Sequence, residues 1–280
     1  MEKIALAVGK EAERLVQAVR ERYGRIAEGQ RSGGCCGGPL PETAVSQGIG
    51  YQAEELGAVP EEANLGLGCG APIGFLKPVA GETVLDLGSG AGIDCFLAAK
   101  EVGPTGKVIG VDMTPEMLER ARAGAAKHGL GQVEFREGRL ESLPVADGSV
   151  DAVTSNCVIN LVPDKQAVFR EVARVLKPGG RLVISDIVLD GKLPESVEKD
   201  IYAYVGCVSG AAQRADYFAL LAEAGLSEIA ILRDVDYVAN LCQSVPEEVA
   251  VFEKKTGVNP AELAGKVRSI TFRAVKPARA

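Results

Sequence analysis

Residues 84–92 of the chain read VLDLGSGAG, a short apolar run that passes directly into a glycine-rich loop. Short apolar runs bounded by glycine are typical of buried strands. We expect a helix at residues 93–101, so the glycines lie between a strand and a helix. In that position they let the backbone approach a ligand closely, because no side chain intervenes. The stretch therefore predicts a strand, a ligand-binding turn and a helix.

The same alternation of strand and helix continues along the chain. A helix is expected to begin at Thr114-Pro115, because threonine suits the N-cap and proline the first turn of a helix. Another helix is expected at residues 164–176, and KPGG at 177–180 ends it. Apolar runs predict strands at residues 83–87, 108–112, 133–136, 150–155 and 181–187, and further strands at 229–234 and 269–275 that could close the edge of the sheet. Such alternation predicts an α/β protein with a doubly wound, mostly parallel, Rossmann-like sheet.

Three regions are expected along the chain. Residues 1–76 form an extension with an amphipathic helix at about 1–29 and cysteine-containing loops. Residues 77–190 form the ligand-binding core. Residues 191–280 form a small α+β region, with a helical cover over the ligand site and the edge strands.

Composition excludes several classes of function. The chain has 280 residues, of which 46% are hydrophobic and 25% charged, so it can form a sizeable core. Its net charge of −7 argues against nucleic acid or a membrane surface as the main partner, since such proteins carry basic patches. No apolar stretch is long enough to span a bilayer, and charged residues near the N-terminus argue against a signal peptide. We therefore expect a cytoplasmic protein.

Two aspartates indicate what the glycine loop binds. Asp112 ends the second strand, 20 residues after Gly92, where an acid can hold ribose hydroxyls. Asp86 precedes the loop and would repel a pyrophosphate, whereas the cationic S-adenosylmethionine would tolerate it. The glycine spacing is G-x-G-x-G and not the G-x-G-x-x-G of dinucleotide enzymes, which disfavours a dehydrogenase.

The chain contains seven cysteines and no C-x-x-C pair. An odd number of cysteines in a cytoplasmic protein does not predict a disulfide framework. A single cysteine is more often a small buried hydrophobic residue than a ligand. For Cys69, Cys157 and Cys207, however, glycine neighbours and polar flanks favour a site for a soft element assembled in space. Cys95 is interpreted as packing within its helix, and Cys242 is given no role.

Three motifs resemble known methyltransferases. Residues 84–92 resemble motif one of the class I S-adenosylmethionine-dependent methyltransferases, and VLKPGG at 175–180 resembles the turn after their fourth strand. SNCVINL at 155–161, GCG at 68–70 and the Gly-Cys pair at 206–207 resemble arsenite methyltransferases more specifically. The resemblance is specific from about residue 50 to 190 and looser to residue 212.

The resemblance implies methylation of trivalent arsenic, as arsenite or methylarsenite, for arsenic detoxification. It implies that Cys157 and Cys207 bind arsenic(III) and that Cys69 is their thiol partner. Either Cys35 or Cys36 would be a fourth, redox-active thiol. A reductant such as thioredoxin or glutathione would then reset the enzyme. Because arsenic(III) presents its own lone pair, the transfer would need no general base, unlike most transfers to oxygen or carbon.

S-adenosylmethionine is the expected co-substrate, and we expect no metal cofactor to be required. The residues assigned to its site are Asp86, Gly88, Gly90, Gly92, Asp112, Met113, Glu141 and Asn156.

Two other functions remain open. A methyltransferase of the same fold could act on a quinone, a sterol or another small acceptor, with incidental cysteines. The chain could instead be a non-catalytic, thiol-rich protein that sequesters arsenite or zinc. The intact glycine loop and Asp112 argue against a vestigial cofactor site.

Overall fold

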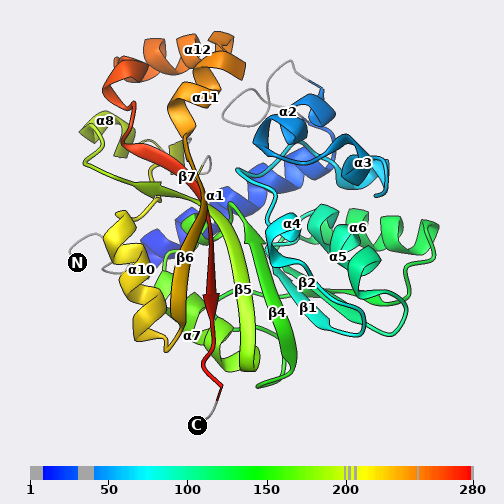
Figure 1. The fold of residues 1–280 in the computed structure, drawn as a ribbon. Helices are drawn as coiled ribbons and strands as arrows, with labels where there is room; N and C mark the ends of the chain where they lie inside the picture. Colours follow the sequence, from blue (N-terminus) through cyan, green and yellow to red (C-terminus); the bar gives the residue numbers. More distant parts are fainter. Residues whose placement is uncertain are drawn as a thin grey trace.

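A computed structural model describes residues 9–30, 41–198, 200, 203–204, 207–244 and 246–278. Over these ranges the chain forms a seven-stranded sheet with helices on both faces (Figure 1). The order of the strands is β3-β2-β1-β4-β5-β7-β6. The first five run parallel to one another, whereas β7 is antiparallel to β5 and β6 is antiparallel to β7. The predicted fold class, a mostly parallel doubly wound sheet closed by two late strands, is confirmed.

The strands agree closely with the predicted ranges. They are β1 Thr83–Leu87, β2 Lys107–Asp112, β3 Val133–Glu137, β4 Val150–Asn156, β5 Leu176–Leu189, β6 Ser227–Asp236 and β7 Val267–Val275. The largest difference is at β5, which begins at Leu176 and not at Arg181. Leu176 pairs with Val150 before the KPGG turn, and the register then shifts so that Arg181 pairs with Ala152.

The longer helices lie on the faces of the sheet and beyond one end of its strands (Figure 1). They are α1 Lys10–Ala27, α2 Glu42–Ile49, α5 Ile93–Val102, α6 Pro115–Lys127, α7 Lys165–Val175, α10 Arg214–Glu223, α11 Tyr237–Ser244 and α12 Pro246–Thr256. The short helices are α3 Ala53–Leu56, α4 Ile73–Leu76, α8 Glu195–Glu198 and the 3₁₀ turns η1 Glu61–Ala63, η2 Ile159–Leu161 and η3 Pro260–Glu262. Thr114 is at the predicted N-cap of α6, but its side chain makes no capping hydrogen bond.

Successive side chains of the buried strands point to opposite faces of the sheet, so a hydrophobic core forms on each face. In β1, Leu85 and Leu87 belong to the core that includes residues of α7 and α10, whereas Val84 belongs to the core that includes residues of α5 and α6. This is the two-residue period of a strand that is covered on both sides.

The order of the strands places β1 beside β4, although they are the first and fourth strands in sequence. At such a switch point the chain leaves the two neighbouring strands in opposite directions, which opens a crevice beyond their carboxyl ends. The glycine loop follows β1, and Cys157 follows β4. The fold therefore directs both motifs to one crevice.

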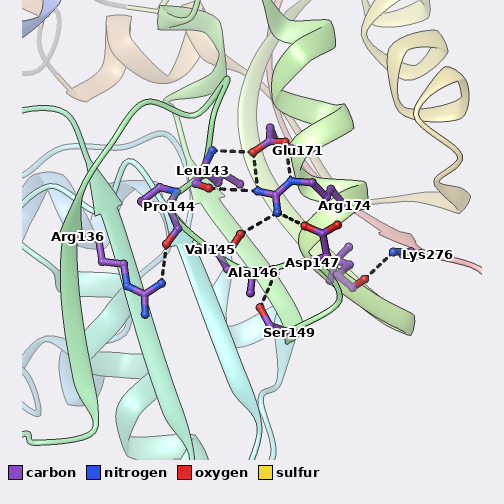
Figure 2. Close-up of polar contacts among 11 residues, drawn as sticks. Arg136, Leu143, Pro144, Val145, Ala146, Asp147, Ser149, Glu171, Arg174 and Lys276 are labelled. Atoms are coloured by element: carbon purple, nitrogen blue, oxygen red, sulfur yellow. Dashed lines mark hydrogen bonds and ion pairs between the residues drawn. The ribbon is translucent and has the colours of Figure 1, made fainter.

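Arg174 of α7 fixes the segment that connects β3 to β4 (Figure 2). Its guanidinium donates to the carbonyl oxygens of Leu143 and Val145, at 3.1 and 2.8 Å, and to the carboxylate of Asp147. Glu171, one turn earlier, accepts hydrogen bonds from Arg174 and from the Leu143 N–H. The paired side chains thus hold the segment that follows Glu141, a residue assigned to the cofactor site.

Among the described residues, no helix is both long enough and apolar enough to cross a membrane.

Four aromatic side chains pack together between β7, an antiparallel strand near the edge of the sheet, and the helices α7 and α10. Tyr217 contacts Phe169, Phe218 and Phe272 edge to face, with ring centroids 5.3–6.4 Å apart. Phe272 of β7 also contacts Phe218, at 5.4 Å, and is fully buried.

Phe272→Ala should therefore lower the free energy of unfolding by about 3–5 kcal/mol, because it leaves a cavity in this cluster. The measurement is equilibrium denaturation in urea. Phe75, which is 41% exposed, provides the matched control, and Phe75→Ala should change stability far less. Equal losses in the two variants would contradict the importance of the cluster.

Candidate active site

The glycine loop has the backbone conformation that only glycine adopts without strain. Gly88, Gly90 and Gly92 all have positive φ angles, of 67°, 52° and 95°. A Cβ atom at Gly92 would lie 2.8 Å from the ring of Phe135, and one at Gly88 would collide with the side chain of Val158. Gly88 and Gly90 line a pocket, whereas Gly92 is the N-terminal cap of α5.

Asp112 lies at the end of β2, opposite this loop. Its carboxylate accepts hydrogen bonds from the N–H groups of Gly90 and Thr114, at 2.9 and 2.8 Å. Burial raises its pKa above the usual value, while these hydrogen bonds oppose the increase. The carboxylate lines the pocket and thus faces whatever the glycine loop binds.

Two further carboxyl groups, Asp86 and Asp94, line the pocket. Asp86 accepts a hydrogen bond from the thiol of Cys95 at 3.3 Å, and burial together with the charge of Asp94 holds its pKa well above the usual value. Asp94 accepts hydrogen bonds from the Tyr51 hydroxyl at 2.9 and 3.0 Å, and burial raises its pKa to about 7. Cys95 is buried, as predicted, but it also contacts the pocket's carboxyl group.

The pocket has a volume of about 1230 Å³, its open mouth included. Among the lining residues that the structure describes, Arg139 is the one cation, and it is paired with Glu141 at 2.6 Å. Residues Val16, Val19 and Tyr23 of α1 also line the pocket, as do Met113 and Asn156. An acid-lined pocket with its one lining cation already paired favours a ligand of positive charge.

Three thiols come together beside this pocket. Cys157 and Cys207 line it, and the Cys207 thiol donates a hydrogen bond to the Cys157 carbonyl oxygen at 2.8 Å. The side chains of Cys207 and Cys69 both hydrogen-bond that of Cys157. The bond from Cys207 lowers the pKa of Cys157, but the bond to Cys69 and burial raise it well above its usual value. All three thiols are buried.

Asn156 fixes the loop that carries Cys69. Its side-chain oxygen accepts hydrogen bonds from the N–H groups of Cys69 and Gly70, at 3.0 and 3.3 Å. Its amide nitrogen donates to the Gly70 carbonyl oxygen at 2.7 Å and to the Tyr51 hydroxyl at 2.9 Å. A Cβ atom at Gly68 would lie 2.8 Å from the Asn156 amide, so the glycine beside Cys69 permits this approach.

Of the described cysteines, Cys95 and Cys242 are not part of this cluster. Cys242 is exposed on α11. The assignments of Cys35 and Cys36 lie outside the described residues.

Sequence reasoning missed three polar residues around the site: Tyr51, Asp94 and Asp186. Asp186 stands alone in the apolar end of β5, and an isolated acid inside a buried strand is a signal that could have been used. Tyr51 and Asp94 carry no such signal, because only the fold brings them together.

By its fold and its crevice, the chain is a doubly wound α/β protein whose acid-lined crevice suits a cationic nucleoside. The family model for a methyltransferase domain matches residues 78–225, slightly more than half of the chain. The chain therefore contains the methyltransferase domain that its fold and pocket indicate.

The similar proteins of known activity indicate which methyltransferases this chain resembles most specifically. An arsenite methyltransferase from Halobacterium salinarum is 48% identical over 238 residues, which cover 81% of this chain and 61% of the relative. Another from Aquipseudomonas alcaligenes is 43% identical over 182 residues, 62% of this chain and 52% of the relative. A crystal structure of an arsenic(III) S-adenosylmethionine methyltransferase from Chlamydomonas reinhardtii is 35% identical with a TM-score of 0.60, covering 84% of this chain and 74% of that one.

The chain belongs to the arsenite methyltransferase family of S-adenosylmethionine-dependent methyltransferases. It spans about half to three fifths of the length of the curated relatives from H. salinarum and A. alcaligenes.

The raised pKa of Asp94 has a consequence for stability. The folded state favours the protonated acid, with a pKa of about 7, whereas the unfolded chain ionises near pH 4. The free energy of unfolding should therefore fall as the pH rises from about 4 to 7, by up to about 4 kcal/mol from this group.

Asp94→Asn should remove this fall, so the variant gains stability relative to the parent between about pH 4 and pH 7. Denaturant unfolding at both pH values measures the difference. The exposed Glu119, changed to Gln, controls for the general effect of removing an acid. If Asp94→Asn changes stability equally at both pH values, Asp94 ionises at its ordinary pKa.

Proposed function

We propose that this chain transfers a methyl group from S-adenosylmethionine to trivalent arsenic held by Cys69, Cys157 and Cys207. The observation that carries the proposal is the cluster of three buried thiols at an acid-lined pocket. Sulfur ligands suit a soft, thiophilic element such as arsenic(III). The relatives that match most of the chain carry the same activity in their names.

The carboxyl groups and the glycine loop of the pocket support S-adenosylmethionine as its ligand. When bound, S-adenosylmethionine supplies a methyl group on a positively charged sulfur. Asp112 would hold the ribose hydroxyls, Met113 would pack against the adenine, and the loop at Gly88 and Gly90 would lie along the methionine half. Glu141 and Asn156, which also line the pocket, complete the proposed set. A bound cation would favour the ionised forms of Asp86 and Asp94, whose pKa values burial raises.

The thiols position the acceptor. Three sulfur ligands leave the lone pair of arsenic(III) as the nucleophile, so no side chain has to remove a proton. Burial of the thiols excludes water from the arsenic and keeps its orientation toward the pocket. Catalysis by this chain would then consist mainly of positioning and desolvation.

Methylation formally oxidises arsenic, and two thiols that become one disulfide supply the two electrons that restore the trivalent state. We assign one of these thiols to Cys35 or Cys36, and we assign the resetting of the enzyme to thioredoxin or glutathione in the cytoplasm. In this proposal, residues 1–76 supply thiols, 77–190 bind S-adenosylmethionine, and 191–280 complete the arsenic site. Mass spectrometry of the products formed from purified protein, arsenite, S-adenosylmethionine and a thiol reductant tests the activity directly.

The thiol triad can be tested one residue at a time. Cys157→Ser and Cys207→Ser should abolish methylation of arsenite and of methylarsenite, because serine replaces a soft thiolate with a protonated hydroxyl. Cys69→Ser should slow the methylation of arsenite more than that of methylarsenite, since an already methylated arsenical needs only two protein thiols. X-ray absorption should show three sulfur neighbours around bound arsenic(III).

Cys242→Ser is the matched control, because this thiol is exposed and outside the cluster. Cys95 is a poorer control, since its thiol donates to Asp86 in the pocket. Arsenite methylation at the parental rate by Cys157→Ser would refute the arsenic assignment and favour a carbon or oxygen acceptor.

The proposed cofactor contact gives a further prediction. Asp112→Ala should weaken binding of S-adenosylmethionine by about 2 kcal/mol, because it removes charge-assisted hydrogen bonds to the ribose. Isothermal titration calorimetry measures this loss. The exposed Glu101 provides the control, and Glu101→Ala should leave the affinity unchanged. Parental affinity in the Asp112 variant would exclude the ribose contact.

A further inference from the structure

A carboxylate that the proposed methyl transfer does not use lies against two of the thiols. The Sγ atoms of Cys69 and Cys157 and one carboxylate oxygen of Asp186 all lie within 4.8 Å of one another. All three residues are buried, with exposed fractions of 3%, 9% and 0%. They come from three separate segments: the loop before α4, the residue directly after β4 and the carboxyl-terminal end of β5.

We propose that Cys69, Cys157 and Asp186 form a binding site for a thiophilic divalent cation of the zinc type. This inference goes beyond arsenic methylation. Its third donor is the oxygen of Asp186 and not the sulfur of Cys207, and occupancy requires neither arsenic nor a methyl donor. Bound cation and bound arsenic exclude each other, because both use Cys69 and Cys157.

The donor atoms match the chemistry of such an ion. Zinc in proteins takes sulfur, nitrogen and carboxylate oxygen, with tetrahedral bonds of about 2.0–2.3 Å. Two donors on one ion are then roughly 3.5–3.8 Å apart. The three atoms, within 4.8 Å of one another, need to approach by only about 1 Å to reach this geometry. As the ion binds, the thiols of Cys69 and Cys157 release their protons to solvent.

Asp186 is held in place as a ligand carboxylate would be. Its Oδ1 accepts a hydrogen bond from the Asn160 amide at 2.8 Å, and its Oδ2 accepts one from the Tyr217 hydroxyl at 2.9 Å. Such outer hydrogen bonds orient a ligand and set its affinity for the metal. Oδ1 accepts a second hydrogen bond, from the Ile187 N–H at 2.9 Å, so Oδ2 is the oxygen that keeps a lone pair for a cation.

A buried lysine balances the charge. Two thiolates, one carboxylate and a divalent ion together carry one negative charge. The ammonium of Lys165 is buried, donates to the carbonyl oxygens of Asn160 and Val162, and interacts electrostatically with Asp186. With Lys165 protonated, the occupied site is neutral, which avoids the cost of an uncompensated buried charge.

The pocket provides a route of entry, because Cys157 lines it. An ion that arrives through the pocket meets a thiol first and then the carboxylate of Asp186. A metal site needs such a path as well as its donors.

Cobalt(II) titration of the purified, reduced, metal-free chain tests the site. Exposed or undescribed thiols are first removed by Cys35→Ser, Cys36→Ser and Cys242→Ser. We expect one equivalent of cobalt to produce the thiolate charge-transfer band and the visible bands of a tetrahedral ion. Cadmium bound to the same protein should show two sulfur neighbours and a shell of light atoms by X-ray absorption.

Asp186→Asn should weaken cobalt binding by more than the roughly 10–100-fold that an outer-sphere residue contributes, because it removes a charged ligand. Cys69→Ser and Cys157→Ser should abolish the charge-transfer band. Cys95→Ser is the matched control, a buried thiol outside the cluster that should bind cobalt as the parent does.

An all-sulfur shell around cadmium would overturn the proposal, and so would unchanged cobalt affinity in Asp186→Asn. The X-ray absorption measurement uses no Asp186 variant, so it decides the question even if that variant does not fold. Neither experiment contains arsenic or S-adenosylmethionine, so the result is independent of the proposed methyl transfer.

Discussion

The side chain of Asn156 connects the polypeptide that precedes the sheet to the end of β4, and the whole site depends on this connection. One amide hydrogen-bonds the backbone of Cys69 and Gly70 on one side and the Tyr51 hydroxyl on the other. Because Asn156 directly precedes Cys157, the same residue sets the separation between two thiols that are far apart in sequence. Tyr51 extends the network to Asp94 in the pocket. The carboxyl-lined side and the thiol side of the crevice are therefore parts of one hydrogen-bonded unit.

The two sides differ in their electrostatics. Carboxyl groups line one side, at Asp86, Asp94 and Asp112, and suit a ligand that carries positive charge. The thiols on the other side are buried among apolar residues and suit a soft acceptor. Asp186 and Lys165 add a buried pair of opposite charge beside the thiols. The sequence left metal binding by thiols open as a rival function; in our proposal it is a second role of Cys69 and Cys157, with Asp186 as the third donor.

Much of this arrangement could be predicted from the sequence, because it follows from local patterns. Apolar runs and glycines indicate β1, its loop and α5 almost to the residue, and resemblance to a family indicates Cys69, Cys157 and Cys207. The polar network could not be predicted. Tyr51, Asp94 and Asn156 interact only because the strand order places β4 beside β1 and because the glycine at position 68 lets its loop approach. Cys95 is a further example of a contact that the sequence does not predict. Its position within a helix predicted a packing role, but only the structure shows its hydrogen bond to Asp86.

The backbone at Cys157 and Cys207 has positive φ angles, of 61° and 66°. A residue with a side chain is disfavoured in that conformation by about 1 kcal/mol or more, whereas glycine is not. Glycine at either position would relieve this backbone strain but would remove a thiol of the cluster. The surrounding structure therefore holds both cysteines in a backbone conformation that their side chains disfavour. A search for stabilising glycine substitutions at positive φ angles would select Lys77 and Glu228 as well as these two cysteines, but only at the cysteines would the change remove a thiol of the cluster.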